Sequence, residues 1–259
     1  LQYELRAGDP NLYITLEGTW FERGTPRKGV PNLSIAFPFA LRKASGRYEI
    51  PFGAIDRTQS SGEEVPAIRW AQVNGMAGRE KAGCLLINDS KHGHSLDGST
   101  LRLTLIRSSY EPDPLPEIRQ HKIRLAVSPF AGELSVADAM RLGATLNQPL
   151  RAAGTDVHKG KMPRAGQFIS VRPGNIVLSC LKKAEGENAL VVRVFETSGK
   201  RTVARIKLNG KLLGRLRKAT ETDVLERPLR ASGLKRTANT VSVPVPAYGI
   251  ATVLLKTGK

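Results

Sequence analysis

The sequence predicts a mainly β protein, in which a large antiparallel β-sandwich is followed by one helix and a second, smaller β-sandwich. Short apolar segments alternate with polar residues at period two, the pattern of strands with one buried face. Gly and Pro are frequent between these segments, with 25 and 16 residues, and helical periodicity is rare. We therefore place a large sandwich with its helix at residues 1–150, a polar, basic linker at 151–166 and a small sandwich at 167–259.

Six alternating segments are predicted to be strands of the large sandwich: Leu12–Leu16, Leu33–Phe37, Ile68–Val73, Cys84–Ile87, Leu101–Arg107 and His121–Val127. The dipeptide Asp97-Gly98 is typical of a hairpin turn and leads into the fifth of them. In that fifth segment, alternation places Leu101, Leu103 and Leu105 on the buried face. The same alternation places Arg102, Thr104 and Ile106 on the opposite face.

One helix is predicted to follow the large sandwich. Ser135 can accept a hydrogen bond as its N-cap, and Asp138 suits the positive end of the helix dipole. Val136, Met140 and Leu146 form an apolar stripe, and Asn147-Gln-Pro149 ends the helix.

The small sandwich is predicted to contain seven short strands, a number that fits a domain of about 90 residues. They are Phe168–Val171, Ile176–Leu181, Ala189–Phe195, Val203–Leu208, Val224–Glu226, Val241–Val245 and Ile250–Leu255. Asn209-Gly210 is predicted to form a hairpin turn.

The two cysteines, Cys84 and Cys180, both lie in apolar strand patterns. Strand cysteines usually behave as small hydrophobic residues, so buried free thiols are favoured over a disulfide. No apolar run approaches the roughly 18–20 residues that a bilayer span needs. The sequence therefore favours a soluble, cytoplasmic protein with no membrane partner.

The charge is concentrated in the second half of the chain. Residues 1–150 hold 18 Lys and Arg against 16 Asp and Glu, whereas residues 151–259 hold 22 against 7. Such asymmetry fits nucleic acid, an anionic surface or an acidic partner. However, the basic residues are scattered between strands, and aromatic residues for base stacking are scarce there. We expect no specific nucleic-acid recognition, and we favour either a basic surface that contacts an acidic part of a longer protein or a simple compositional bias of the host.

A polar loop before the fifth strand holds the sharpest candidates for a functional site. His92, His94 and Asp89 lie close together, but two histidines and one acid are short of a closed metal site. A hydrogen-bonded loop without a metal is therefore favoured. Asp89 and Lys91 are suited to an ion pair, which the residues alone favour, or to hydrogen bonds with sugar hydroxyls.

Arg107 ends the fifth strand beside a proline-rich segment. Its rigid fork of donors suits a carboxylate or paired hydroxyls, with a structural salt bridge as the alternative. Trp70 is expected to pack in the core rather than to stack on a sugar. The adjacent Glu63 and Glu64 point to opposite faces of an extended chain. They cannot form the acid pair of a glycosidase, whose carboxyl groups stand roughly 5–10 Å apart.

Several of these segments, taken in order, resemble a known family. The residues that carry the resemblance are Pro51–Arg57, Glu64–Trp70, Gly83–Asn88, the run Asn88–Pro114, Asn175–Glu185, Arg193–Thr197 and Glu221–Glu226. They are similar to the C-terminal region of the family 38 glycoside hydrolases, the retaining alpha-mannosidases. The chain departs from the family pattern at His92 and His94, where aromatic residues are usual, at Ser109 and at Ser128–Phe130.

The resemblance implies a catalytic barrel N-terminal to this chain, with the carboxylate nucleophile, the general acid/base and a zinc ion. The chain itself would be non-catalytic and without a cofactor. It would buttress the barrel and contribute Arg107, Asp89 and Lys91 to the rim of a site for alpha-mannoside glycans. Two other interpretations remain open: a stand-alone carbohydrate-binding β module, and a basic nucleic-acid-binding protein.

Overall fold

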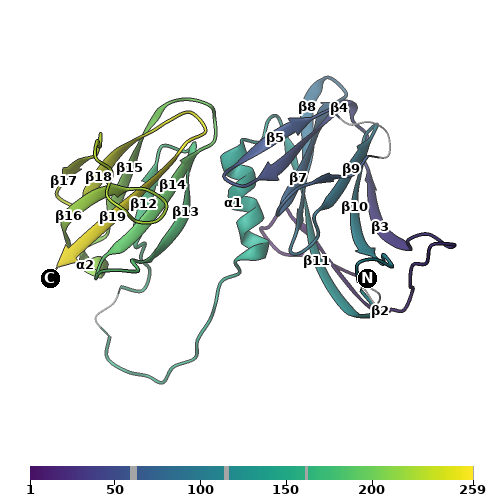
Figure 1. The fold of residues 1–259 in the computed structure, drawn as a ribbon, viewed down its shortest axis with the longest axis horizontal. Coiled ribbons are helices and arrows are strands. Elements are labelled where there is room, and N and C mark those ends of the chain that lie inside the picture. The colour runs from purple at the N-terminus through teal and green to yellow at the C-terminus, as the bar shows by residue number, and fades with distance from the viewer. Residues whose placement is uncertain (59–62, 114–116, 161–162, 259) are drawn as a thin grey trace. The chain divides into compact units, whose positions relative to one another are not determined.

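The computed structural model describes residues 1–58, 63–113, 117–160 and 163–258 and confirms a mainly β chain. It divides into two compact units, Leu1–Leu150 and Arg151–Lys259 (Figure 1). In each unit, two antiparallel sheets enclose an apolar core, so both are β-sandwiches.

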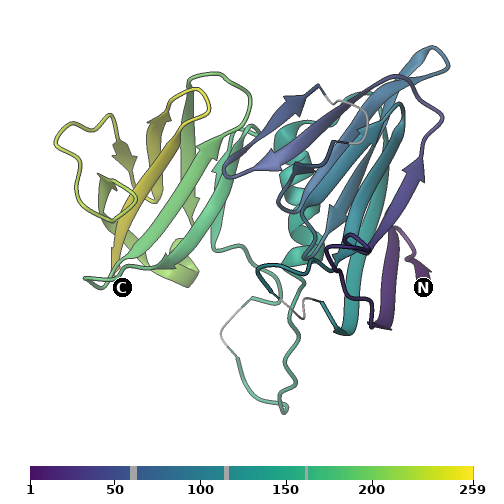
Figure 2. The ribbon, with the colours of Figure 1, turned by 45° about the vertical axis from the view of Figure 1, so that its right-hand side comes forward.

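The sandwich of the large unit consists of a seven-stranded and a four-stranded sheet (Figures 1 and 2). In spatial order, the seven-stranded sheet holds β1 (Gln2–Leu5), β2 (Leu12–Trp20), β11 (Arg119–Ala131), β8 (Glu80–Asn88), β7 (Trp70–Ala77), β4 (Arg42–Ile50) and β5 (Gly53–Arg57). The four-stranded sheet holds β3 (Asn32–Pro38), β10 (Thr100–Arg107), β9 (Gly93–Asp97) and β6 (Val65–Pro66). Apolar side chains such as Val73, Leu86 and Leu103 fill the space between the sheets.

All six strands predicted for this unit are present, but the structure also contains strands that the sequence did not predict. The polar segment before β10 was expected to be a loop, whereas Gly93–Asp97 forms β9. It does so because Asp97-Gly98 closes the predicted hairpin, in which His94 lies opposite Leu103. Gly98 takes a positive φ of 57°, which glycine adopts without strain.

The alternation predicted for β10 fails at its end, where a β-bulge occurs. Thr104 pairs with Ser34, but Ile106 pairs with Leu33, so Leu105 is an extra residue. Ile106 was expected on the exposed face and is instead only 4% exposed. The bulge shifts the pattern by one residue, and Arg107 therefore reaches the exposed face.

Helix α1 (Val136–Asn147) begins and ends where the sequence predicts, and it packs on β7 and β8. The Ser135 hydroxyl accepts the N–H of Asp138 at 3.1 Å, which confirms the N-cap. Trp70 is fully buried, as expected of a core residue. A Cβ at Gly143 would lie only 2.8 Å from Trp70 Cδ1, so this glycine allows the helix to approach the indole closely.

A buried ion pair joins β4 to the segment that leads into β7. The Glu49 side chain is 2% exposed and contacts the Arg69 guanidinium, whose Nε lies 2.9 Å from Glu49 Oε1. Arg69 also donates its main-chain N–H to Glu49 Oε2 at 2.6 Å. Its Nη2 lies 3.4 Å from the sulfur of Met140 on α1. The pair therefore connects the sheet, the segment before β7 and the helix.

The small unit is a sandwich of two four-stranded sheets. One sheet holds β12 (Ile169–Arg172), β15 (Thr202–Leu208), β18 (Thr240–Val245) and β17 (Lys235–Thr237). The other holds β13 (Ile176–Lys183), β14 (Leu190–Glu196), β19 (Ile250–Gly258) and β16 (Arg215–Thr222). Its core is built from β-branched and leucine side chains, among them Val192, Ile206 and Val253.

Two local predictions for the small unit are wrong. Val224–Glu226 is a turn rather than a strand, because the Asp223 carboxylate accepts the N–H groups of Leu225 and Arg227, both at 2.9 Å. Asn209-Gly210 does not form a hairpin turn. Asn209 instead caps the short helix α2 (Gly210–Leu213), with its Oδ1 accepting the N–H of Lys211 at 3.1 Å.

The expected linker, residues 151–166, contains no helix or strand in its described positions, 151–160 and 163–166. Both cysteines are free, as predicted, with Cys84 buried and Cys180 half-buried. Burial raises the pKa of the Cys84 thiol to about 12, so this thiol stays protonated. Among the described residues, no helix is long and apolar enough to cross a membrane.

A second buried carboxylate, that of Glu196, organises one end of the small unit. Its oxygens accept the main-chain N–H groups of Ser198, Gly199 and Tyr248 at 2.7, 2.8 and 3.1 Å. They also accept the side-chain amide of Asn175 at 2.8 Å. Burial alone raises the pKa of Glu196, but these hydrogen bonds outweigh it and lower the pKa to about 2.

We expect Glu196→Gln to destabilise the small unit by about 2–4 kcal/mol, because a carboxamide leaves buried N–H groups unpaired. The wild-type unit should keep this stabilisation above pH 4.5 and lose it as the pH falls toward 2. Hydrogen exchange of the β14 and β19 amides measures this unit separately from the large one.

The control for this experiment is Glu187→Gln, which removes only a half-exposed ion pair with Lys256. It should change the stability by less than about 1 kcal/mol. Equal effects of the two substitutions would show that the Glu196 hydrogen bonds do not stabilise the unit.

Candidate functional site

The predicted site begins at Asn88, the last residue of β8, whose contacts fix the loop that follows. Asn88 is fully buried and donates its N–H to the carbonyl of Arg69 at 2.8 Å. Its Oδ1 accepts the N–H of Lys91 at 2.8 Å, and its carbonyl accepts the side-chain amide of Asn147 at 3.0 Å. The loop is therefore held from the sheet and from the end of helix α1.

Asp89 forms an ion pair with Arg124 of β11, not with Lys91. Arg124 donates Nε to Asp89 Oδ2 at 2.9 Å and its main-chain N–H to Oδ1 at 3.3 Å. The sequence favoured an ion pair between Asp89 and Lys91, and this prediction is wrong. Strand pairing explains the outcome: Asn88 lies opposite Leu125, which places Arg124 beside the start of the loop.

Because Asp89 pairs with Arg124, the ammonium group of Lys91 remains unpaired within the described structure. Its main-chain N–H is used by Asn88, and its side chain is half-buried. Within the parts of the chain that the structure describes, its ammonium group has no acidic or hydrogen-bonding partner. The loop thus presents the free ammonium group of Lys91 near the Asp89 carboxylate, which Arg124 already holds.

The two histidines, His92 of the loop and His94 of β9, make structural contacts. His92 Nδ1 lies 2.9 Å from the carbonyl oxygen of Ile68, which accepts its hydrogen. His94 is fully buried, with Nδ1 3.2 Å from the His92 carbonyl and its ring edge-on to Tyr48 at 6.4 Å. The described residues contain no group of three His, Cys, Asp or Glu side chains placed to hold a metal ion. Both Nδ1 atoms are thus used in hydrogen bonds with main-chain carbonyl groups.

Burial sets the ionisation of the two aromatic groups beneath the loop. It lowers the pKa of His94 to about 4 and raises the pKa of Tyr48 to about 12. Both groups are therefore neutral near pH 7, and His94 Nε2 has no hydrogen-bond partner in the described structure. These shifts come from packing in the core and do not indicate an acid or base for catalysis.

Arg107 lies at the exposed end of β10, opposite Asn32. The next residue is anchored, because the Ser108 hydroxyl accepts the Trp20 indole N–H at 2.8 Å and its N–H bonds the Pro31 carbonyl. No described residue pairs with the Arg107 guanidinium. The salt bridge that was the alternative role for Arg107 is absent from the described part of the chain.

The three predicted site residues do not form one cluster of contacts. Asp89 and Lys91 lie near Leu125 of β11, whereas Ser108, next to Arg107, bonds Trp20, which lies opposite Arg119 of β11. Six residues of extended strand separate these points, a distance of about 20 Å. The residue that the sequence analysis missed is Arg124, whose exposed position in an alternating strand was the available signal.

Comparison with known proteins identifies the chain. Residues 1–115 match the model of the glycosyl hydrolases family 38 C-terminal domain. Residues 175–253 match the model of the family 38 C-terminal beta sandwich domain, so the two models follow one another and match most of the chain. The chain belongs to glycosyl hydrolase family 38. It corresponds to the C-terminal region of the family 38 alpha-mannosidases.

Curated relatives of this family 38 chain are alpha-mannosidases. Alpha-mannosidase 2C1 of Homo sapiens is 28% identical over 86% of this chain and 21% of its own length. Alpha-mannosidase G of Dictyostelium discoideum is 30% identical over 61% of this chain and 15% of its own length. The chain thus spans about a fifth of the length of the curated relatives it matches.

A solved structure has the same fold. The crystal structure of a family 38 protein from Enterococcus faecalis superposes with a TM-score of 0.75. It covers 96% of this chain and is 17% identical to it, and the matched part is 28% of that protein. This likeness confirms the arrangement of the strands in the family 38 chain.

We expect the large unit to lose about 2–3 kcal/mol of stability as the pH falls from 6.5 to 4. In this window the unfolded chain binds a proton at His94, whereas the folded chain does not. His94→Phe should remove most of this pH dependence. Tryptophan fluorescence during urea unfolding measures it, because both tryptophans, Trp20 and Trp70, lie in the large unit.

The matched control is His158→Phe, because His158 is exposed and lies outside the sandwich. This variant should keep the wild-type pH dependence. The explanation fails if His94→Phe retains the same loss of stability between pH 6.5 and 4.

Proposed function

We propose that this chain is the non-catalytic C-terminal part of a retaining alpha-mannosidase. In the full protein it buttresses an N-terminal catalytic barrel and contributes to the rim of the site for alpha-mannosides. The observation that carries the proposal is the match to two C-terminal domain models of family 38 in their order along the chain. The names of the curated relatives support the substrate class.

The charges of the large unit support a non-catalytic role. A retaining glycosidase needs two carboxyl groups about 5–5.5 Å apart, one as nucleophile and one as acid/base. Here Glu49, Asp56 and Asp89 are each held by an arginine. A carboxylate neutralised in this way is a poor nucleophile. We therefore assign the acid pair to the proposed barrel.

Zinc belongs, in this proposal, to the same barrel, where it would grip sugar hydroxyls and stabilise developing charge. The described residues of this chain supply no ligand set for it. The chain's own contribution is therefore mechanical support and hydrogen-bond donors. No step of the reaction is assigned to its residues.

Arg107, Lys91 and Asp89 are the residues that we propose for the rim. Arg107 and Lys91 are cations without partners in the described structure, so their donors can reach sugar hydroxyls or a carboxylate of the barrel. Asp89 is fixed by Arg124 and keeps lone pairs for a further hydroxyl. Because the contacts of Ser108, next to Arg107, reach β11 about 20 Å along that strand from the contacts of the Asp89 loop, the three residues would act at separate points of the rim.

In the full-length protein, we expect Arg107→Ala to lower kcat/KM by about 30- to 1,000-fold, the scale for losing a charged hydrogen-bond donor in the transition state. The melting temperature should change little, because Arg107 holds no described residue. Steady-state kinetics with an aryl alpha-mannoside and thermal unfolding measure the two effects.

Arg102→Ala is the control, because Arg102 is exposed on the same strand and makes only a surface ion pair with Asp97 at 3.8 Å. It should leave kcat/KM within about twofold of the wild type, as expected for an exposed pair. A large fall in melting temperature with unchanged activity per folded molecule would make Arg107 a structural residue.

The chain produced on its own should hydrolyse no aryl alpha-mannoside and bind no stoichiometric zinc, because we assign the acid pair to the barrel and the described residues contain no group placed to hold a metal ion. Enzyme assays and metal analysis of the purified chain test this. Turnover with tightly bound zinc would refute the non-catalytic role. Tight binding of neutral mannosides by the chain alone would favour the carbohydrate-binding module.

A further inference from the structure

The outer face of the sheet β12-β15-β18-β17 is strongly basic. Four exposed cations project from it: Arg172, Arg205, Lys207 and Lys235. The strand register aligns them with hydroxyl side chains in two rows across the sheet. One row is Ser170, Lys207, Thr240 and Thr237, and the other is Arg172, Arg205, Ser242 and Lys235. We call these eight residues the basic face.

The charge of the basic face is not compensated by the protein. None of the four strands contains Asp or Glu. No described residue forms an ion pair or hydrogen bond with any of the four cationic side chains. Arg172 lies directly opposite Arg205 on the neighbouring strand, an arrangement of like charges that destabilises a sheet. Such a cost is recovered when an anion binds between the two side chains.

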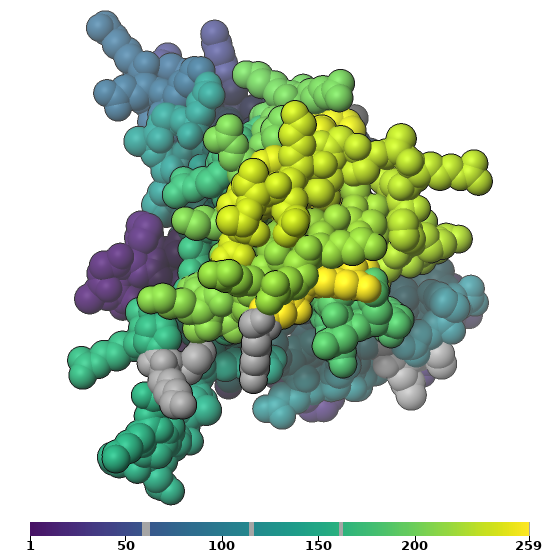
Figure 3. Space-filling model, turned by 90° about the vertical axis from the view of Figure 1, so that its left-hand side faces the viewer, coloured from purple at the N-terminus to yellow at the C-terminus, as the bar shows by residue number. Residues whose placement is uncertain are grey.

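The basic residues of this half were expected from the sequence to be scattered, and the basic face is a local exception. They are dispersed along the chain, but residues 172, 205, 207 and 235 meet on one sheet. Alternation also separates Lys235 from its neighbour Arg236, which instead donates to the carbonyl of Leu216 at 2.8 Å. The space-filling view shows long side chains that project from the small unit, coloured green to yellow (Figure 3).

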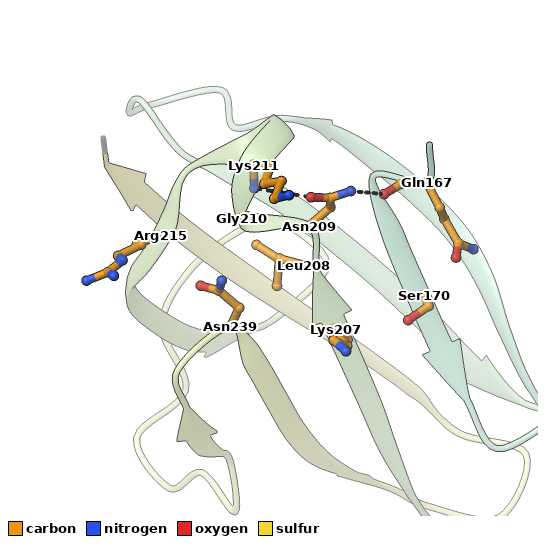
Figure 4. Close-up of a pocket in the computed structure, with 9 residues that line it drawn as sticks. All are labelled: Gln167, Ser170, Lys207, Leu208, Asn209, Gly210, Lys211, Arg215 and Asn239. Carbon is orange, nitrogen blue, oxygen red and sulfur yellow. Dashed lines mark hydrogen bonds between the residues drawn. The ribbon is translucent and has the colours of Figure 1, made fainter. Parts of the chain in front are cut away.

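A pocket adjoins one end of the basic face and shares Lys207 and Ser170 with it (Figure 4). Its volume is about 670 Å³, within the range of small-molecule sites. Lys211 and Arg215 add two more cations, and Asn239 and Gln167 add carboxamides. The walls are held by Asn209, whose side chain accepts the Lys211 N–H and donates to the Gln167 carbonyl (Figure 4).

We propose that the basic face and this pocket bind a glycan that carries sulfate or phosphate esters. Arginine and lysine bind such oxyanions through charge-assisted hydrogen bonds. Hydroxyl and carboxamide side chains both donate and accept hydrogen bonds, which matches the hydroxyl groups of sugar rings. The pocket takes one substituted ring, and the flat face takes the following residues of the chain.

The composition of the surface favours a glycan over a nucleic acid. Single-stranded nucleic acids bind where aromatic side chains stack on bases, and the basic face has no aromatic residue. The face spans four strands of three to seven residues, about 15 Å across the sheet. Phosphate contacts alone do not require a pocket of carboxamides. Charge and hydroxyl groups together therefore point to a substituted sugar chain.

The test is a binding titration of the chain with a short heparin-derived oligosaccharide at about 0.15 M salt, where nonspecific surface attraction is largely screened. Saturable binding is expected, with at least about tenfold weaker binding of an unsubstituted oligosaccharide of the same length. A phosphorylated oligosaccharide, compared with the sulfated one, identifies which ester is preferred. Binding of neither ester at this salt concentration would refute the proposal.

The site is located by a double variant and a control of equal charge. Arg205→Gln with Lys207→Gln should weaken the binding at least about tenfold. Lys183→Gln with Lys218→Gln removes the same charge from exposed positions on the other sheet and should change it less than about twofold. Equal losses in the two variants would show unspecific attraction.

Tighter binding of duplex DNA, or of an acidic peptide of the same charge, would overturn the glycan as the ligand. The mannosidase proposal is independent of all these results.

Discussion

The large unit depends on the buried ion pair between Glu49 and Arg69. Removing Arg69 would leave the Glu49 carboxylate, which is 2% exposed, without its cation, a change that costs about 3–5 kcal/mol for a fully buried pair. Arg69 also touches Met140 on helix α1, and its carbonyl accepts the N–H of Asn88. Asn88 in turn holds the loop of Asp89 and Lys91. The position of the proposed rim loop therefore follows from one carboxylate that lies on a strand far from it in sequence.

The small unit also contains a buried carboxylate, but it is satisfied in a different way. Among the residues that the structure describes, no cationic side chain pairs with Glu196, which is held by main-chain and amide N–H groups and by the Ser198 hydroxyl. This arrangement fixes the turn after β14 and the segment before β19 without a cationic side chain, although Lys200 donates its main-chain N–H at 3.1 Å.

Period-two alternation predicted the strands that have one clearly apolar face, and the cap residues of helix α1 predicted its ends. The alternation failed where polar or small residues form strands, as in β4 (Arg42–Ile50) and β9 (Gly93–Asp97), whose partners decide their structure. The partner of Asp89 was missed for a similar reason. Lys91 is near in sequence, but Arg124 is brought beside Asp89 by strand pairing, which a single sequence does not reveal.

The bulge at Leu105 allows one strand, β10, to bury its apolar residues and still expose Arg107. Leu101, Leu103 and Ile106 must all reach the core, and Arg107 must face solvent. Strict alternation cannot meet both demands, because it assigns positions 101, 103 and 107 to the same side. The extra residue, Leu105, reverses the side of the sheet that each later residue of the strand faces. A single deletion between positions 104 and 107 would therefore exchange the side that the arginine faces.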